Sequence, residues 1–231
     1  VKMNGQTVGQ VAFGLKGASA GGYVETVGPV LARILAQAGV PAERVSNTVQ
    51  SLSNACVIGA WFENEDARTA MAWVARSAPA ALLPNRLGVW EAYAFGPPAA
   101  VADHRIEADE VLDIEEDGTA PAPAGEIRVG WGRIWTGYRT GELAPTLTGT
   151  EAVERLTTEY RWAVIEDAEV KARHPRTWRK IEITTALRRQ ADAQALAQTF
   201  KGLFGLSASG EPRRMQRVTL ELTPARLAAR L

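Results

Sequence analysis

The segment from Ala55 to Phe95 constrains the fold most, because three differently patterned stretches follow one another within it. Cys56–Phe62 is apolar and has about the length of a strand, so a strand is predicted there. Asn64 is placed to cap a helix whose apolar residues recur every three or four positions. Two strands are predicted at Ala80–Leu83 and Val89–Phe95, on either side of a turn that contains Pro, Asn and Gly. The segment therefore predicts a strand, a helix and a hairpin, with no cluster of reactive side chains.

A further helix is predicted upstream, where an apolar stripe runs along Val27–Ala38. Thr26 is placed to cap its start, and Gly39 followed by Pro41 ends it. Together with the first segment, this helix makes residues 23–95 a small α/β module, in which two helices pack on a mainly antiparallel sheet.

The composition is that of an ordinary globular chain without a strong electrostatic preference. Of its 231 residues, 46% are hydrophobic and 23% are charged, and 26 Lys and Arg balance 26 Asp and Glu. This balance argues against a general nucleic-acid binder, which would need a basic excess. No apolar run reaches the roughly 18 residues of a membrane span, so no span is expected. The single Cys56 excludes an internal disulfide and fits folding in a reducing compartment.

The second half changes to alternating strand patterns after Gly96–Ala100, which has the composition of a linker. The predicted domains are therefore residues 1–98, an α/β module, and residues 99–231, a β-barrel or sandwich with one helix at Arg189–Phe204. The strands of this half are predicted at or around Val111–Ile114, Ile127–Trp135, Tyr160–Val164, Ile181–Ile183 and Val218–Leu222. The predicted fold class is α+β.

Ser19 lies in a stretch that matches G-x-S-x-G, the nucleophile elbow of serine hydrolases. The elbow needs a helix that starts at the serine, followed later in the chain by an acid and a histidine. Only His104 and His174 offer a base, and the alternating strand–helix units of hydrolases do not follow. A glycine loop between a strand and a helix is the favoured interpretation, and Ser19 is predicted to be catalytically idle.

Acidic residues gather between Asp103 and Asp117, and a pair of them near Asp113 is the second enzymatic hypothesis, a glycosidase. Such a pair is defined by the distance between two carboxyl groups, which a sequence does not give. Acidic residues at strand ends more often form a solvated edge that prevents aggregation. His104 and His174 lack metal-ligand spacing, and no phosphate or dinucleotide loop is present. No catalytic, metal or cofactor residue is therefore assigned, and no cofactor is expected.

Two further features support binding hypotheses. Arg173–Lys180 is a local basic patch, for which a contact between subunits is favoured over phosphate binding. Trp131, Trp135 and Tyr138 define the third functional hypothesis, in which a small β module presents them to a ligand.

Several stretches together resemble a known family. The first half runs from GGYVET through a helix to AGVPAERV and VIGAWFENEDARTAMAWVARS, followed by the hairpin. This half resembles the α/β insertion module of the tail hub (tail tip or baseplate hub) proteins of phages and prophages. The second half is similar to the tube-like β-domain of such hubs and the helix after its strands, in EIRVGWGRIWTG, EYRWAVIEDAEVKARHP, DAQALAQTFKGLFG and MQRVTLELTP.

The resemblance implies a structural protein and not an enzyme, with a hydrolase or a ligand-binding β module as the alternatives. It implies a hub that closes the tail tube, forms a threefold ring in the full-length parent and needs no cofactor in this region. The expected partners are the tube or distal tail protein, the tape measure, and tip or fibre proteins, without nucleic-acid specificity. The expected location is the host bacterial cytoplasm during assembly and then the virion or a tail-like particle. We also expect the chain to be an internal fragment with further β-structure on both sides.

Overall fold

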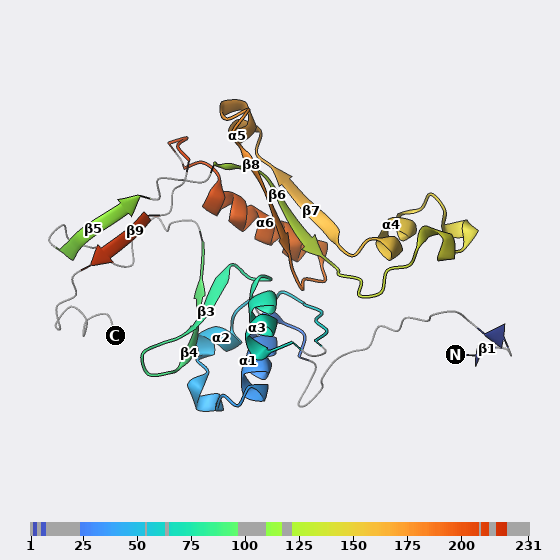
Figure 1. Ribbon diagram of the computed structural model, residues 1–231, viewed down its shortest axis with the longest axis horizontal. Helices are drawn as coiled ribbons and strands as arrows, with labels where there is room; N and C mark the ends of the chain where they lie inside the picture. The colour runs from blue at the N-terminus through green and yellow to red at the C-terminus, as the bar shows by residue number, and fades with distance from the viewer. Residues whose placement is uncertain are drawn as a thin grey trace. The chain divides into compact units, whose positions relative to one another are not determined.

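The computed structural model of the chain describes residues 2–3, 6–7, 24–53, 55–62, 65–96, 110–116, 122–207, 209–212 and 216–220. Helices and strands both occur in this part, which confirms the predicted α+β class (Figure 1). None of the described helices has both the length and the apolar character that crossing a membrane requires.

Contacts within the chain group it into two compact units, each made of three stretches. The first unit comprises Val1–Phe95, Val129–Ala163 and Ile183–Leu196, and the second comprises Gly96–Arg128, Val164–Glu182 and Ala197–Leu231. The predicted division into residues 1–98 and 99–231 stays a prediction, and most of its linker lies outside the described residues.

Three helices build a core in the first unit: α1 (Val27–Gln37), α2 (Asn47–Gln50) and α3 (Ala67–Ala75). α1 packs against the other two, and the apolar stripe predicted for it faces this core. The buried residues that these helices and their ends contribute are Val27, Leu31, Ile34, Leu35, Val49, Leu52, Ala70 and Val74. The periodicity of the sequence therefore predicted the buried faces of α1 and α3 correctly.

The ends of these helices differ in part from the prediction. Thr26 occupies the N-cap position of α1, but its side chain makes no capping hydrogen bond. The predicted capping of α3 by Asn64 was wrong, because Asp66 is the residue that directly precedes this helix. Asp66 Oδ1 accepts a hydrogen bond from Thr69 N at 3.0 Å, and Oδ2 accepts one from Thr69 Oγ1 at 2.7 Å. Aspartate is among the best N-cap residues, since it satisfies a backbone donor that the helix leaves open.

The strand predicted at Cys56–Phe62 is not formed, and only Val57 and Ile58 make isolated bridges. Val57 pairs with Thr26, whereas Ile58 pairs with Leu187, so consecutive residues bond to two different segments. Ile58 is buried, which accounts for the apolar character of this stretch. Because the two bridges go to different segments, Cys56–Phe62 forms no continuous ladder with one partner strand.

The predicted hairpin is confirmed as β3 (Ala80–Pro84) and β4 (Trp90–Ala94), which pair antiparallel. The mainly antiparallel sheet expected for residues 23–95 consists of these two strands in the described residues. Asn85 Oδ1 accepts hydrogen bonds from Leu87 N at 2.9 Å and from Val89 N at 3.0 Å. Gly88 has a φ of 73°, a left-handed conformation that glycine adopts readily. Turn chemistry in the sequence was therefore sufficient to place this hairpin.

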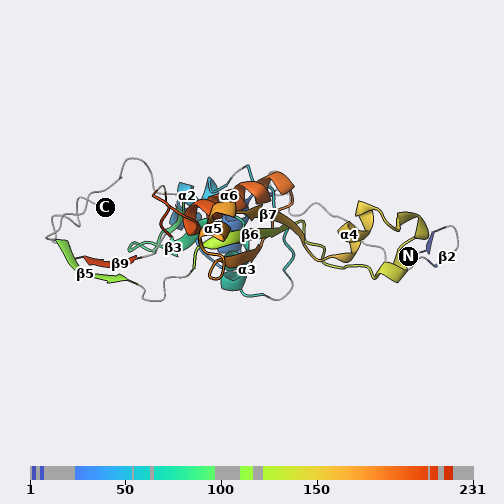
Figure 2. The same cartoon turned by 90° about the horizontal axis from the view of Figure 1, so that it is seen from above.

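The strands of the second half form two separate sheets. One has the order β7-β6-β8, from β6 (Ala124–Trp131), β7 (Arg161–Glu166) and β8 (Arg179–Thr184). The other pairs β5 (Val111–Glu116) antiparallel with β9 (Gln216–Leu220). Figure 2 shows both sheets from above, together with α6 (Gln190–Phe204), the predicted last helix. No barrel is closed among the described residues, so the barrel or sandwich stays a prediction.

Short elements complete the described structure. β1 (Lys2–Met3) pairs with β2 (Gln6–Thr7), and single 3₁₀ turns lie at Ala42–Arg44, Thr140–Glu142 and Pro145–Leu147. The short helix α4 (Glu151–Thr157) follows the last of these turns. The sequence did not predict α5 (Ala168–Arg173), because this segment is polar and lacks an apolar period.

Candidate functional site

The residues of the two enzymatic hypotheses are only partly described. Ser19 and His104 lie outside the described residues, so the serine-hydrolase hypothesis stays a prediction. Asp113 is exposed on β5, whereas Glu110 is buried just before this strand, and the glycosidase hypothesis also stays a prediction. His174 is the C-cap residue of α5. Within the described residues there is no group of three or more side chains that could hold a metal ion.

Cys56 lies half-buried in the first unit. Burial raises the pKa of its thiol above the ordinary value, and the Asp192 carboxylate raises it further, while Arg189 acts in the opposite direction. Since the thiolate is the reactive form of cysteine, a raised pKa keeps this side chain a protonated and unreactive thiol at neutral pH.

The three aromatic residues of the ligand-binding hypothesis are not presented together. Trp131 is only 8% exposed and Tyr138 is half-buried, whereas Trp135 is 44% exposed. Instead, each of the two tryptophans lies under an arginine side chain in the first unit. We call these the paired stack, Arg133 on Trp135, and the open stack, Arg161 on Trp131.

The paired stack is electrostatically complete. Arg133 Cζ lies 3.9 Å from the centroid of the Trp135 ring and within 6 Å of the rings of Trp73 and Tyr160, at 5.8 and 5.6 Å. Its Nε and Nη2 approach the same Oε1 of Glu159 at 2.9 and 2.8 Å. The guanidinium therefore has three aromatic rings and a carboxylate as partners, an arrangement typical of a satisfied cation.

Aromatic contacts tie the paired stack to α3. The Trp73 ring on α3 lies 5.8 Å from the Trp135 ring, and Phe62 meets Trp73 edge-on at 5.8 Å and 88°. Burial raises the pKa of Tyr160, and the Arg133 charge opposes this rise, so the phenol stays protonated at neutral pH. Edge-to-face and tilted pairs of this kind favour a defined geometry.

The open stack has the same aromatic contact but no acidic partner. Arg161 Cζ lies 3.8 Å from the centroid of the Trp131 ring. Its Nε is buried and has no hydrogen-bond partner in the described structure, and no ion pair joins Arg161 to a described carboxylate. Burial lowers the pKa of Arg161, and the like charge of Arg155 lowers it further. This site therefore holds a cation, partly removed from water, beside a second cation.

Gly132 makes room for the open stack. Its φ is 60°, in the left-handed region, and a Cβ at this position would lie 2.6 Å from Arg161 Nη2. The residue thus ends β6 and leaves the space that the guanidinium occupies. No role was predicted for Arg133, Glu159 or Arg161 from the sequence, although arginine and aromatic residues alternate in GWGRIW and EYRW. That alternation is the signal from which the stacks could have been inferred.

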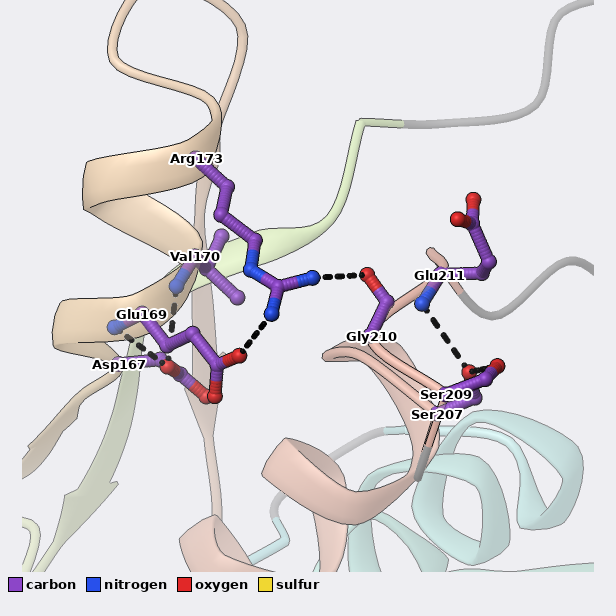
Figure 3. A network of polar contacts seen from close by, with 8 residues as sticks. All are labelled: Asp167, Glu169, Val170, Arg173, Ser207, Ser209, Gly210 and Glu211. Atoms are coloured by element: carbon purple, nitrogen blue, oxygen red, sulfur yellow. Dashed lines mark hydrogen bonds and ion pairs between the residues drawn. The ribbon is translucent and has the colours of Figure 1, made fainter.

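The predicted basic patch lies in the second unit, where two of its four cations form ion pairs with described carboxylates. Lys180 pairs with Glu182 at 2.7 Å, and Arg173 pairs with Glu169 at 2.7 Å. Arg173 Nη1 also donates to the Gly210 carbonyl at 3.1 Å, as Figure 3 shows. Exposed ion pairs of this kind contribute about 0–1 kcal/mol each. Arg173 and Lys180 are thus engaged within the chain, which weakens the hypothesis that these two cations grip a phosphate.

Asp167, in the second unit, both caps α5 and forms an ion pair with α6. Its Oδ1 accepts hydrogen bonds from Glu169 N and Val170 N, each at 3.1 Å, at the start of α5 (Figure 3), and Lys201 Nζ on α6 lies 3.2 Å from Oδ2. Burial alone would raise its pKa, but the Val170 amide and the Lys201 ammonium outweigh that effect and hold the pKa below the ordinary value of 3.8. Asp167 thus links α6 to the end of β7.

We expect Asp167→Ala to lower the free energy of unfolding by about 0.5–2 kcal/mol, because α5 loses its cap. Asp167→Asn keeps a capping oxygen and should lose only the charge. Since the pKa of Asp167 in the folded chain lies below 3.8, its charge contributes fully to the free energy of unfolding above that pH. This contribution is lost as the pH falls through the folded pKa. Urea unfolding of both variants between pH 7 and pH 2 measures this, and an Asn variant whose deficit grows on acidification would contradict it.

The geometry thus offers packing, ion pairing and a stacked cation, Arg161, that has no acidic partner in the described residues. Arginine stacked on tryptophan is a common recognition element at protein contacts, where aromatic residues and arginine are enriched. Comparison with known proteins adds no relative: no protein-family model matches the chain, and no curated protein matches it at a significant level.

Proposed function

We propose that the chain is a structural component of a phage-type tail tip or baseplate hub, which closes the tail tube and connects it to tip or fibre proteins. The resemblance described above supports this proposal. It rests on the order helix, strand, helix and hairpin, of which α1, α3 and the hairpin are formed and the strand between the helices is not. The observation that carries most weight is an exposed apolar face on the β3–β4 hairpin. Extended apolar surface is uncommon on soluble monomers and is typical of protein contacts.

The strand register defines this apolar face. It places Leu83 opposite Glu91, two positions before Tyr93, and the pairing continues to Phe95 through its backbone N–H. Facing and alternate residues of an antiparallel pair share one face, so Leu83, Tyr93 and Phe95 lie on the same side. Their exposed fractions are 55%, 46% and 51%, and Leu87 in the turn is 76% exposed. The hairpin therefore leaves these four apolar side chains open to a partner, beside the Glu91 carboxylate on the same face, whereas Trp90 is half-buried.

One edge of the hairpin is also open. Ser46 N donates to Trp90 O at 2.9 Å, and Ala92 N donates to Thr48 Oγ1 at 3.1 Å, so neighbouring chain covers the edge of β4. No described strand pairs with the outer edge of β3. Open strand edges readily accept a strand from another chain. The exposed apolar face of the hairpin and the open edge of β3 together fit the fixed, repeated contacts within an assembled particle better than they fit a transient contact.

The proposed role is non-enzymatic and needs no cofactor. The proposed partners are the tube or distal tail protein, the tape measure, and tip or fibre proteins, with a threefold ring in the full-length parent. Rings of this kind need heterologous contacts that close. The protein would be made in the host bacterial cytoplasm and end in a virion or tail-like particle.

Antibodies raised against the chain test this function. On tail-like particles from the cells that make the protein, they should label one end of the tail in electron micrographs. Light scattering should show the full-length parent as a trimer or a multiple of it. A parent that stays monomeric, is absent from particles and turns over a soluble small molecule would overturn the proposal.

The double substitution Leu83→Ser with Tyr93→Ser tests the hairpin face itself. We expect an unchanged melting temperature, because both side chains are already exposed, but reduced incorporation of the parent into particles. Immunoblots of purified particles measure the incorporation. Val164→Thr on β7 is a matched control, since Val164 is also an exposed apolar strand residue, and it should be incorporated normally. Normal incorporation of the double variant would show that this face makes no contact in the particle.

A further inference from the structure

The open stack of the first unit holds a charge that the described structure does not balance. Arg161 is half-buried, its Nε is buried without a hydrogen-bond partner, and its closest aromatic contact is Trp131 at 3.8 Å. A buried polar atom without a partner is costly, and a guanidinium more so. Most such atoms in folded proteins are satisfied, so the exception calls for an explanation, although the Nε atoms of Arg128 and Arg179 share it among the described residues. Because the Nε of Arg161 is itself buried, an external partner would bind the rest of the guanidinium.

The neighbourhood of Arg161 is cationic. Arg155 lies in the last turn of α4, its charge lowers the pKa of Arg161, and no described carboxylate forms an ion pair with either residue. Two like charges without a counterion destabilise the folded chain, and a negative group between them would remove that penalty. Arg161 as a whole is only half-buried, so this group can reach the part of its side chain other than the buried Nε from outside the chain.

The paired stack shows which anion such a site accepts. Arg133 lies on Trp135 at 3.9 Å, nearly the distance of Arg161 from Trp131, and the Glu159 carboxylate binds its Nε and Nη2. The open stack reproduces the arginine and the tryptophan but lacks the acid. A carboxylate is therefore the chemistry that would make the two stacks equivalent.

We propose that Arg161 and Arg155, with Trp131 as the platform, form a binding site for the carboxylate of an acidic segment of a partner protein. A carboxylate is favoured over a nucleic-acid phosphate because the chain has 26 basic and 26 acidic residues and thus no basic excess to hold a polyanion. Planar guanidinium groups match carboxylate geometry, and stacking on tryptophan fixes their orientation. This inference does not depend on the proposed hub function.

Arginine side-chain NMR spectra of the full chain test the site, with end-blocked hexaglutamate as the probe. Hexaglutamate should shift the Nε–H signal of Arg161, and hexaglutamine should not. Arg161→Gln should weaken binding by roughly tenfold or more, as expected when a hydrogen bond between charged groups is lost. Arg155→Gln should weaken it less and leave the melting temperature unchanged or raised, because a like-charge contact is removed. Arg68→Gln is the matched control, an exposed arginine on α3, and should bind as the wild type does.

Arg161→Lys covers the case in which Arg161→Gln does not fold. It retains the charge but loses the planar fork, and it should also bind more weakly. Equal binding of hexaglutamine, tighter binding of a short oligonucleotide than of hexaglutamate, or an equal loss in Arg68→Gln would overturn the proposal.

Discussion

Replacing Leu31 with alanine is expected to lower the free energy of unfolding by about 2–5 kcal/mol. Leu31 is fully buried on α1, where this helix packs against α2 and α3. The substitution removes apolar surface from the core and leaves a cavity that neighbouring side chains fill only in part. A domain is typically stable by only about 5–15 kcal/mol, so this one change would remove a large fraction of the total.

Urea unfolding followed by circular dichroism measures the effect, with an unchanged slope showing that the denatured state is the same. Arg33→Ala is the matched control, because Arg33 is exposed on the same helix two positions away. It should change the free energy of unfolding by less than about 0.5 kcal/mol. A Leu31→Ala variant as stable as Arg33→Ala would mean that the buried face of α1 is wrongly assigned.

The sequence predicted the elements whose causes are local. The apolar stripe of α1 is a repeat of three and four residues that can be read directly from the sequence. The turn after β3 depends on Asn85 and Gly88, which are only three positions apart. The helix α6 and its stop at Gly205 were recognised for the same reason. Such features need no knowledge of the rest of the molecule.

The features that the sequence did not predict depend on distant residues. Val57 and Ile58 are apolar because they bridge to Thr26 and Leu187, and no local pattern distinguishes that from a continuous strand. The cap of α5 is stabilised by Lys201, which lies far along the chain on α6. Polar helices such as α5 lack a periodic pattern of apolar residues, so capping residues and ion pairs determine where they form.

The candidate site was hidden for the same reason. Arg161 begins β7 and Trp131 ends β6, so the pairing of these two strands brings Arg161 onto its tryptophan. Arg133 and Trp135 are only two positions apart, but the Glu159 that completes their stack comes from beyond a long connection. The sequence singled out Trp131 and Trp135 as ligand contacts, but the alternation of arginine with them was not read as a sign that arginines cover them. Alternation of arginine and aromatic residues on two neighbouring strands is therefore worth testing as a sign of such stacks.

Gly28→Ala should also destabilise the chain strongly, although alanine normally favours a helix over glycine by about 1 kcal/mol. A Cβ on Gly28 would lie 2.4 Å from the Val49 carbonyl oxygen and 2.5 Å from that of Gln50. These are backbone atoms of α2, and Gly28 N also donates to Leu52 O at 3.0 Å, so α1 cannot move away without breaking that bond. We expect a loss of about 1–3 kcal/mol, the usual range for overpacking.

Gly141→Ala separates the collision from the general effect of removing a glycine. A Cβ there meets no atom within 4 Å, and the backbone is not left-handed. This control should therefore be neutral or stabilising by about 0.4–1 kcal/mol, through the lower entropy of the unfolded chain. Because α1 and α2 approach closely, Gly28→Ala should lower the free energy of unfolding, whereas Gly141→Ala should leave it unchanged or raise it. Thermal and urea unfolding measure both changes. If Gly28→Ala were as stable as Gly141→Ala, the backbone contact between these helices would not be part of the fold.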